Sequence, residues 1–325
     1  MLFHAMQRVA LPGFAQKAII FGGTGVHLFF LLSGFGLALS KHNDSVGGFY
    51  RRRLVKVWWP YAVALTLSWG LAAGLHLFPD GGAAWLAGVL GYQMFFPAYM
   101  ESFGGHFWFI STILQFYLVF PGLRWLFRRW NNGWYFTVFC LLASAVWWVV
   151  VFALGKGAVR SWNSFFMQFL WEFGLGMALA HAVKNEQIPE WAARWWQPEK
   201  WWLWILGGLA GATVMLLLVL KTGQLGPIFN DIPALTGYGM LCVGVYWLAV
   251  LYAPVVERFF TWLGEISFSV YLVHIIVLEL FLFILRSNGY TFQIFWIPLF
   301  LLLACLAGYG YEKITKNISI FNKNN

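Results

Sequence analysis

Nine apolar segments, each about as long as a membrane-spanning helix, limit what this chain can fold into. A helix needs about 20 residues to cross a hydrocarbon layer of about 30 Å. The apolar runs are continuous rather than alternating, which predicts helices and not barrel strands. The predicted spans are residues 19–40, 57–78, 107–127, 134–155, 162–183, 201–220, 232–253, 265–285 and 292–311. We therefore expect an all-α fold, a polytopic transmembrane helix bundle of about ten spans in which the first is incomplete.

Two further apolar segments are too short to be full spans. Residues 1–10 would form at most about 15 Å of helix, about half of a bilayer. They lack the basic start and the long apolar run of a signal peptide, so we expect either a truncated first helix or a start codon placed late. Residues 83–98 contain Gly88, Gly91 and Pro97, and we expect a re-entrant or interfacial segment there.

Composition excludes a soluble protein. Apolar residues make up 61% of the 325 residues and charged residues only 10%, against about 45–50% and about 25% in ordinary globular chains. If the spans alternate in direction from an outward-directed first helix, most of the 21 Lys and Arg residues lie on the cytoplasmic side, in agreement with the positive-inside rule. The net charge of +9 therefore reflects membrane topology, and we expect no nucleic-acid partner.

One membrane domain is expected over residues 1–312, because no internal repeat and no soluble domain interrupts the spans. Residues 313–325 form a polar cytoplasmic tail, and we expect its Asn-rich stretch 315–325 to be disordered. The chain is expected to be a multi-pass protein of the cell membrane, either a plasma membrane or a bacterial inner membrane, surrounded by membrane lipids. Cys140, Cys242 and Cys305 each fall in a predicted span as small apolar residues, and no spacing predicts a metal site.

Ionisable residues inside membrane spans are costly, so each one is a candidate for function. The candidates are His4, His27, Glu101, His106, Glu172, His181, Glu265, His274 and Glu279. Several fall toward one side of the membrane or near its surfaces. A shared polar cavity is one interpretation, and separate hydrogen bonds between helices are the other.

Three adjacent arginines, Arg51, Arg52 and Arg53, precede the span that begins at residue 57. At a cytoplasmic helix edge such residues commonly anchor the topology, and the pattern alone favours this interpretation. The alternative is a phosphate clamp, because guanidinium groups bind phosphate oxygens with paired hydrogen bonds.

The helix predicted to begin near residue 107 carries polar side chains on one face. Ser111 and Gln115 are four residues apart, which places them on the same side of a helix. They would either line a path for a substrate from the outer side or form hydrogen bonds with neighbouring helices. In the span 19–40, closely spaced small residues permit close contact between helices.

Four sequence blocks occur in order along the chain. They are Phe29-Phe30-Leu31-Leu32-Ser33-Gly34-Phe35; Phe49-Tyr50-Arg51-Arg52-Arg53 with Pro60-Tyr61; His106, Trp108, Ser111 and Gln115-Phe116-Tyr117; and Leu263-Gly264-Glu265-Ile266-Ser267 with Tyr271-Leu272-Val273-His274. Each block is weak alone, but the four in register resemble the acyltransferase family 3 of integral membrane acyltransferases. The resemblance extends from residue 1 to about residue 312.

Two positions depart from the pattern of this family. The first helix of the family carries an Arg eleven residues before a His; His4 matches the His, and the Arg would precede residue 1. The family usually has a Glu where this chain has Ile113. A carboxylate role at that position would have to come from another residue, such as Glu101.

The resemblance implies acyl transfer across the membrane. The family takes an acyl group, often acetyl, from a coenzyme A thioester on the cytoplasmic side and delivers it to a hydroxyl of a sugar, commonly on a cell-surface glycan. It therefore implies acyl-CoA, with acetyl-CoA expected, as the donor substrate and a carbohydrate as the acceptor. No bound cofactor is expected.

The resemblance also implies roles for particular residues. His4 would be the catalytic general base, because a neutral imidazole can take a proton from a poorly nucleophilic hydroxyl. The arginines Arg51, Arg52 and Arg53 would bind the phosphates of coenzyme A. The acceptor cavity would be lined by His106, Trp108, Ser111, Gln115 and Tyr117. Structural or open roles remain for Ser33, His274 and Glu101.

Two other functions are compatible with the sequence. A transporter or flippase of lipid-linked sugars would often show internal repeats, and none is visible here. A non-catalytic membrane scaffold or sensor is the second alternative, and the missing Arg and Glu of the family pattern make it worth testing.

Overall fold

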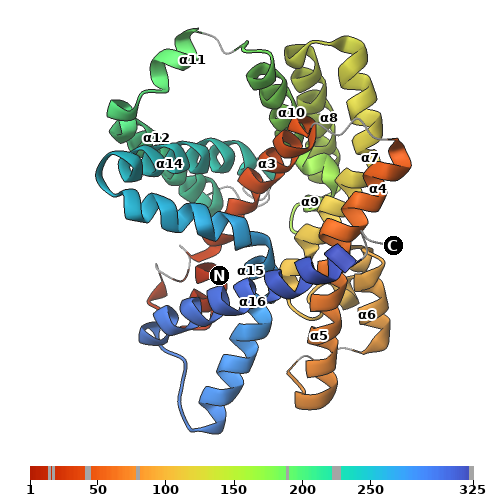
Figure 1. Ribbon diagram of the computed structural model, residues 1–325, viewed down its shortest axis with the longest axis vertical. Helices are drawn as coiled ribbons and strands as arrows, with labels where there is room; N and C mark the ends of the chain where they lie inside the picture. The colour runs from red at the N-terminus through yellow and green to blue at the C-terminus, as the bar shows by residue number, and fades with distance from the viewer. Residues whose placement is uncertain are drawn as a thin grey trace. The chain divides into compact units, whose positions relative to one another are not determined.

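A computed structural model describes residues 1–13, 16, 19–40, 45–77, 81–187, 190–221 and 228–321 (Figure 1). Within these ranges all regular structure is helical and there is no strand, which confirms the predicted all-α class. The chain divides into two compact units. One consists of Met1–Gly22, Asp44–Ser111 and Arg258–Asn325, and the other consists of Gly23–Asn43 and Thr112–Glu257.

Seven helical segments of the described chain are long and apolar enough to cross a membrane, which supports a multi-pass membrane protein. The helices that form them are α3 (Val26–Leu39), α7 (Trp108–Trp130), α8 (Gly133–Ala153), α12 (Trp201–Lys221), α14 (Asp231–Tyr252), α15 (Pro254–Ser287) and α16 (Ile297–Phe321). Each overlaps one of the nine predicted spans.

The other two predicted spans correspond to shorter helices. The span predicted at 57–78 is α5 (Trp59–Leu75), 17 residues long, which ends because His76 takes a left-handed conformation with φ of 51°. The span predicted at 162–183 is α10 (Leu170–Lys184), 15 residues long and preceded directly by the 3₁₀ helix Phe166–Phe169. The extended Phe165, with φ of −64° and ψ of 145°, precedes the 3₁₀ helix, and α10 starts only after Phe169. Hydropathy alone does not reveal such backbone breaks.

The segments that the sequence treats as incomplete spans are short helices. Residues 1–10 contain only α1 (Leu2–Met6). Residues 83–98 contain α6 (Gly82–Val89) and two 3₁₀ turns, which is too short to cross a bilayer, as predicted. Two other short α-helices are α9 (Arg160–Asn163) and α11 (Glu190–Trp195).

A wide helical turn joins the arginine block to the next helix. Helix α4 (Val46–Arg53) begins at Ser45, whose hydroxyl accepts a hydrogen bond from the Gly48 backbone N–H at 3.2 Å. It continues without a break into a π-helical segment, Leu54–Trp58, and then into α5. Isolated π turns inside α-helices occur frequently at functional sites.

In the second unit, α3 packs against α10, α10 against α8, and α12 against α14 (Figure 1). A Cβ on Gly34 of α3 would clash with the Phe173 carbonyl, and one on Gly176 of α10 would clash with the Leu31 carbonyl. Small residues therefore let these two backbones meet closely, as the sequence predicts for this span.

The predicted disorder of the tail is wrong for its first part. Residues 313–321 continue α16 as a regular helix to Phe321, because nothing in this stretch is a helix breaker such as Gly or Pro. Residues 322–325 of the predicted tail lie outside the described residues. The predicted domain boundary at 312 falls inside α16.

Candidate active site

Three histidines that lie far apart in the sequence meet in the first unit. His4 belongs to α1, His106 to the 3₁₀ turn Gly105–Phe107, and His274 to α15. The ring centroids of His4 and His274 are 5.3 Å apart, those of His106 and His274 4.9 Å, and those of His4 and His106 6.2 Å. The structure thus brings together the histidines of three of the matched segments.

Hydrogen bonds favour one tautomer in two of these rings. His4 Nδ1 lies 3.2 Å from the side-chain oxygen Oε1 of Gln7, so Nδ1–H donates and Nε2 carries the lone pair. His274 Nδ1 lies 2.7 Å from the Tyr271 carbonyl oxygen and donates to it in the same way. A neutral imidazole with a lone pair on Nε2 has the form that a general base requires.

A pocket of about 250 Å³ opens beside His4. The described residues that line it are His4, Gln7, Arg8, Ile275 and Leu278. The Arg8 guanidinium forms an ion pair of 2.5 Å with the carboxylate of Glu279 on α15. Because α1 has only five residues and such a short helix is unstable alone, this pair and the histidine contacts hold it against α15.

A strained turn places His106. Phe103 and Gly104 have positive φ values of 57° and 107°, and a Cβ on Gly104 would lie 2.9 Å from His106 Nδ1. The Tyr271 hydroxyl donates a hydrogen bond to the His106 carbonyl oxygen. The turn and this hydrogen bond direct the buried imidazole of His106 toward α15.

The other predicted site residues lie elsewhere in the two units. Arg51 is exposed and Arg52 and Arg53 are half-buried at the end of α4, where the Arg53 guanidinium lies 5.7 Å from the centre of the Phe49 ring. The Glu101 carboxylate lies next to Gly105, the residue before His106.

The predicted polar face of α7 is divided between the units. Trp108 is half-buried and Ser111 is buried in the first unit, whereas Gln115 and the buried Tyr117 belong to the second. The Gln115 side-chain oxygen accepts a hydrogen bond from the Phe166 backbone N–H at 3.3 Å. Among the predicted acceptor residues, His106 has its ring beside that of His4, with the centroids 6.2 Å apart. In the second unit, Ser33 is half-buried on α3, next to Gly34.

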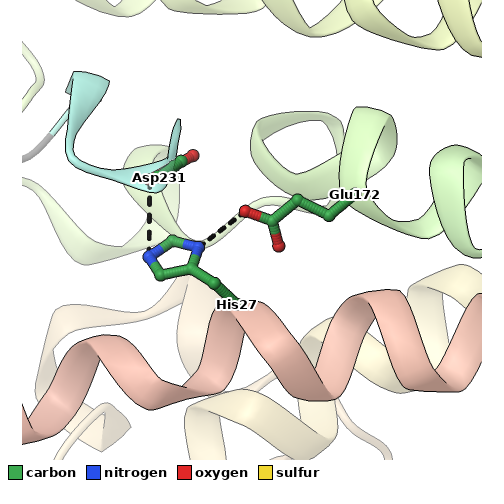
Figure 2. Close-up of side chains that lie close together, drawn as sticks. All are labelled: His27, Glu172 and Asp231. Carbon is green, nitrogen blue, oxygen red and sulfur yellow. Dashed lines mark hydrogen bonds and ion pairs between the residues drawn. The ribbon is translucent and has the colours of Figure 1, made fainter. Parts of the chain in front are cut away.

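The second unit contains a separate buried cluster of His27, Glu172 and Asp231, shown in Figure 2. His27 Nδ1 lies 2.7 Å from Glu172 Oε1, and His27 Nε2 lies 3.6 Å from Asp231 Oδ1. Each residue offers one metal-ligand atom, and these atoms lie within 4.8 Å of one another. No spacing motif reveals this cluster in the sequence, because its members are spread over three helices.

Asp231 and Gln7 belong to these sites but were not predicted from the sequence. Asp231 was missed because the predicted span began at residue 232, yet an acidic residue directly before an apolar run is a common sign of a helix start. Gln7 was missed although it lies three residues after His4, a spacing that places side chains together on a helix.

Comparison with known proteins connects the chain to acyl transfer. A family model described as an acyltransferase domain matches residues 1–310. The chain is also 26% identical over 295 residues to "Acyltransferase MdmB" of Streptomyces mycarofaciens, an alignment that covers 79% of this chain and 68% of that protein. No solved structure matches it.

Proposed function

The chain belongs to the acyltransferase 3 family and is therefore a multi-pass membrane enzyme that transfers acyl groups, and we propose that it moves an acetyl group from acetyl-CoA to a carbohydrate hydroxyl with His4 as the general base. The observation that carries this proposal is the meeting of His4, His106 and His274 beside a pocket. We place the enzyme in a plasma membrane or a bacterial inner membrane, with acetyl-CoA supplied from the cytoplasm.

The proposed reaction is a direct transfer. His4 Nε2 takes the proton of the acceptor hydroxyl while the hydroxyl oxygen attacks the thioester carbonyl. The new C–O bond forms, the C–S bond breaks, and the imidazolium returns its proton to the coenzyme A thiolate. Gln7 supports this role because it accepts the Nδ1 hydrogen and so leaves Nε2 basic.

The remaining assignments follow the family resemblance. Arg51, Arg52 and Arg53 would bind the phosphates of the donor, since three guanidinium groups at one helix end suit a polyanion. His106 would contact the acceptor, and His274 would hold the His4 ring in place. The acceptor would be part of a cell-surface or exported carbohydrate.

The test uses the purified protein in proteoliposomes with radiolabelled acetyl-CoA and glycan extracted from the source membranes. Wild type should release coenzyme A and label the glycan. His4→Gln should lower kcat by about 10²- to 10⁴-fold, the usual contribution of a general base. His76→Gln is the matched control, because His76 is an exposed histidine at the end of α5.

The outcomes separate the rival functions. Full activity in His4→Gln would reject His4 as the base. A transporter would move glycan and leave the thioester intact, whereas a scaffold would leave both unchanged. Coenzyme A release without label in the glycan would reject the carbohydrate acceptor.

A further inference from the structure

We propose that the second unit binds a divalent metal ion, for which zinc is the best candidate, through His27 Nε2 and Asp231 Oδ1, with Glu172 orienting the imidazole (Figure 2). This site lies outside the histidine cluster of the proposed reaction. Its three residues come from the first turns of three different helices, α3, α10 and α14.

The first argument is the hydrogen-bond geometry of the imidazole. Glu172 Oε1 is 2.7 Å from His27 Nδ1; when Glu172 is ionised and the ring is neutral, Nδ1–H donates to this carboxylate and Nε2 carries the lone pair. That lone pair faces Asp231 Oδ1 at 3.6 Å. Two acceptors that face each other repel unless a proton or a metal cation lies between them, and the metal is the occupant that we propose.

The second argument is the length of this separation. A distance of 3.6 Å is too long for a hydrogen bond between Nε2 and Oδ1. Two ligand atoms about 2.1 Å from a tetrahedral zinc ion lie about 3.4 Å apart. The separation of the two atoms therefore suits two ligands of one metal ion.

The third argument is charge balance. The side chains of His27, Glu172 and Asp231 are 5%, 0% and 2% exposed. When both are ionised, two carboxylates buried beside a neutral imidazole carry a net negative charge in a region that solvates charge poorly. Such carboxylates are neutralised either by protons or by a bound cation, and a divalent cation cancels the charge of both at once. Glu172 and Asp231 also lie in the first turns of α10 and α14, where the helix dipole favours the ionised carboxylates that a metal requires.

A second layer of contacts orients the ligands. Gln168 Nε2 donates to Asp231 Oδ2 at 2.7 Å and to the Ile228 carbonyl at 2.9 Å. This leaves Asp231 Oδ1 directed at His27. Glu172 Oε2 has no hydrogen-bond partner among the described residues, so this carboxylate is bound on one side only. A carboxylate–histidine–metal arrangement of this kind is common in zinc sites.

The chemistry of the donors limits the choice of metal. Imidazole and carboxylate ligands suit zinc or manganese, whereas copper(I) and iron–sulfur clusters prefer thiolates. The protein supplies two ligands, and water or a ligand oxygen would complete the coordination. The bound ion would join α3, which carries His27, to α14, which carries Asp231. Helix α10 would take part through Glu172, which holds the imidazole.

The experiment measures metal content and coordination. Wild-type protein in detergent is stripped with EDTA, dialysed against zinc chloride and analysed by mass spectrometry. We expect about one zinc per chain, and binding should also raise the Tm. His27→Gln and Asp231→Asn should each bind less than about a fifth of this amount, because each removes one of two ligands.

Matched controls lie in the same unit. His181→Gln changes a histidine of the same helix as Glu172, and Glu190→Gln removes an exposed carboxylate; both should bind zinc as wild type does. X-ray absorption at the zinc edge should report nitrogen and oxygen neighbours only. That spectrum needs only the wild type, so the proposal stays testable if a variant does not fold.

Three results would overturn the proposal. They are wild-type protein without bound zinc after dialysis, equal zinc in wild type and His27→Gln, or sulfur in the first shell of the absorption spectrum. None of these results would change the outcome that we expect in the acyl-transfer assay, because His27 and Asp231 take no part in the proposed reaction. The two proposals can therefore fail separately.

Discussion

At the scale of single residues, the basicity of His4 depends on one neighbour. Gln7 accepts the Nδ1 hydrogen at 3.2 Å and thereby selects the tautomer with a free Nε2 lone pair. A carboxylate in place of the amide would accept the same hydrogen. Gln7 is therefore a positioning residue that acts through His4.

Replacing Gln7 tests this dependence. Gln7→Leu should lower kcat about five- to tenfold, the value of one hydrogen bond, and leave the KM for acetyl-CoA unchanged. Gln7→Glu should retain most of the activity. Steady-state kinetics in proteoliposomes give both parameters. A change confined to KM, or equal loss in both variants, would contradict the role.

The sequence was informative for histidines in recognisable blocks and uninformative for partners far along the chain. His4, His106 and His274 were candidates from their motifs, and the structure places their rings together. The contact between His27 and Asp231 joins residues about 200 positions apart. Only the folded packing of α3 and α14 determines such a contact, so spacing motifs could not predict it.

At the scale of helices, close packing of α3 on α10 depends on glycines at the contact. Helix α3 carries one glycine at this contact and another outside it. Gly34 meets the Phe173 backbone, whereas Gly36, two residues along the same helix, has open space where a Cβ would be. Backbone atoms cannot move aside as a flexible side chain can. The two positions therefore form a matched pair for substitution.

Gly34→Ala should destabilise the protein by about 1–3 kcal/mol, the usual cost of overpacking. Gly36→Ala should leave stability unchanged or raise it slightly, because Ala favours a helix by up to about 1 kcal/mol over Gly. Thermal unfolding followed by tryptophan fluorescence reports the difference. Equal Tm values for the two variants would show that the helices do not meet at Gly34.

A second pair of residues fixes a very short helix. Arg8, two residues after the end of α1, pairs with Glu279 on α15 at 2.5 Å, and α1 carries His4. Glu279→Arg alone should reduce kcat at least tenfold, since it places like charges together and displaces the helix. The charge swap Arg8→Glu with Glu279→Arg should restore much of the activity. A swap as inactive as the single variant would mean that the pair does not hold α1.

The ends of helices were harder to predict than their existence. All nine apolar segments overlap helices, but α5 stops at the left-handed His76 and α10 starts only after the extended Phe165. Hydropathy averages over a window and does not register a single φ value. The tail was predicted as disordered from its polar composition, yet α16 continues through it to Phe321.

At the scale of the whole molecule, charge sets the expected orientation. The loop after α10 and the loop after α15 fall on opposite sides of the membrane in the predicted topology, with the first in the cytoplasm. Orientation follows from the Lys and Arg residues in the short loops. It is independent of the reaction and can be measured first.

Reporter fusions check the orientation. Green fluorescent protein fused after Gln187 should fluoresce, because it remains in the cytoplasm, and a fusion after Asn288 should not. Alkaline phosphatase fused at the same two positions should give the opposite activities. The reverse pattern would place the arginine block on the outer side, away from cytoplasmic acetyl-CoA, and would contradict the proposed donor route.

The π-helical segment Leu54–Trp58 has a consequence for how the arginine block faces its surroundings. A π turn holds one residue more than an α turn, so it resets the angular phase between the helix before it and the helix after it. Deleting one residue from this segment would restore ordinary winding and swing Arg51, Arg52 and Arg53 by about 100° around the axis relative to α5. The direction in which three positive charges point is therefore encoded by a single surplus residue.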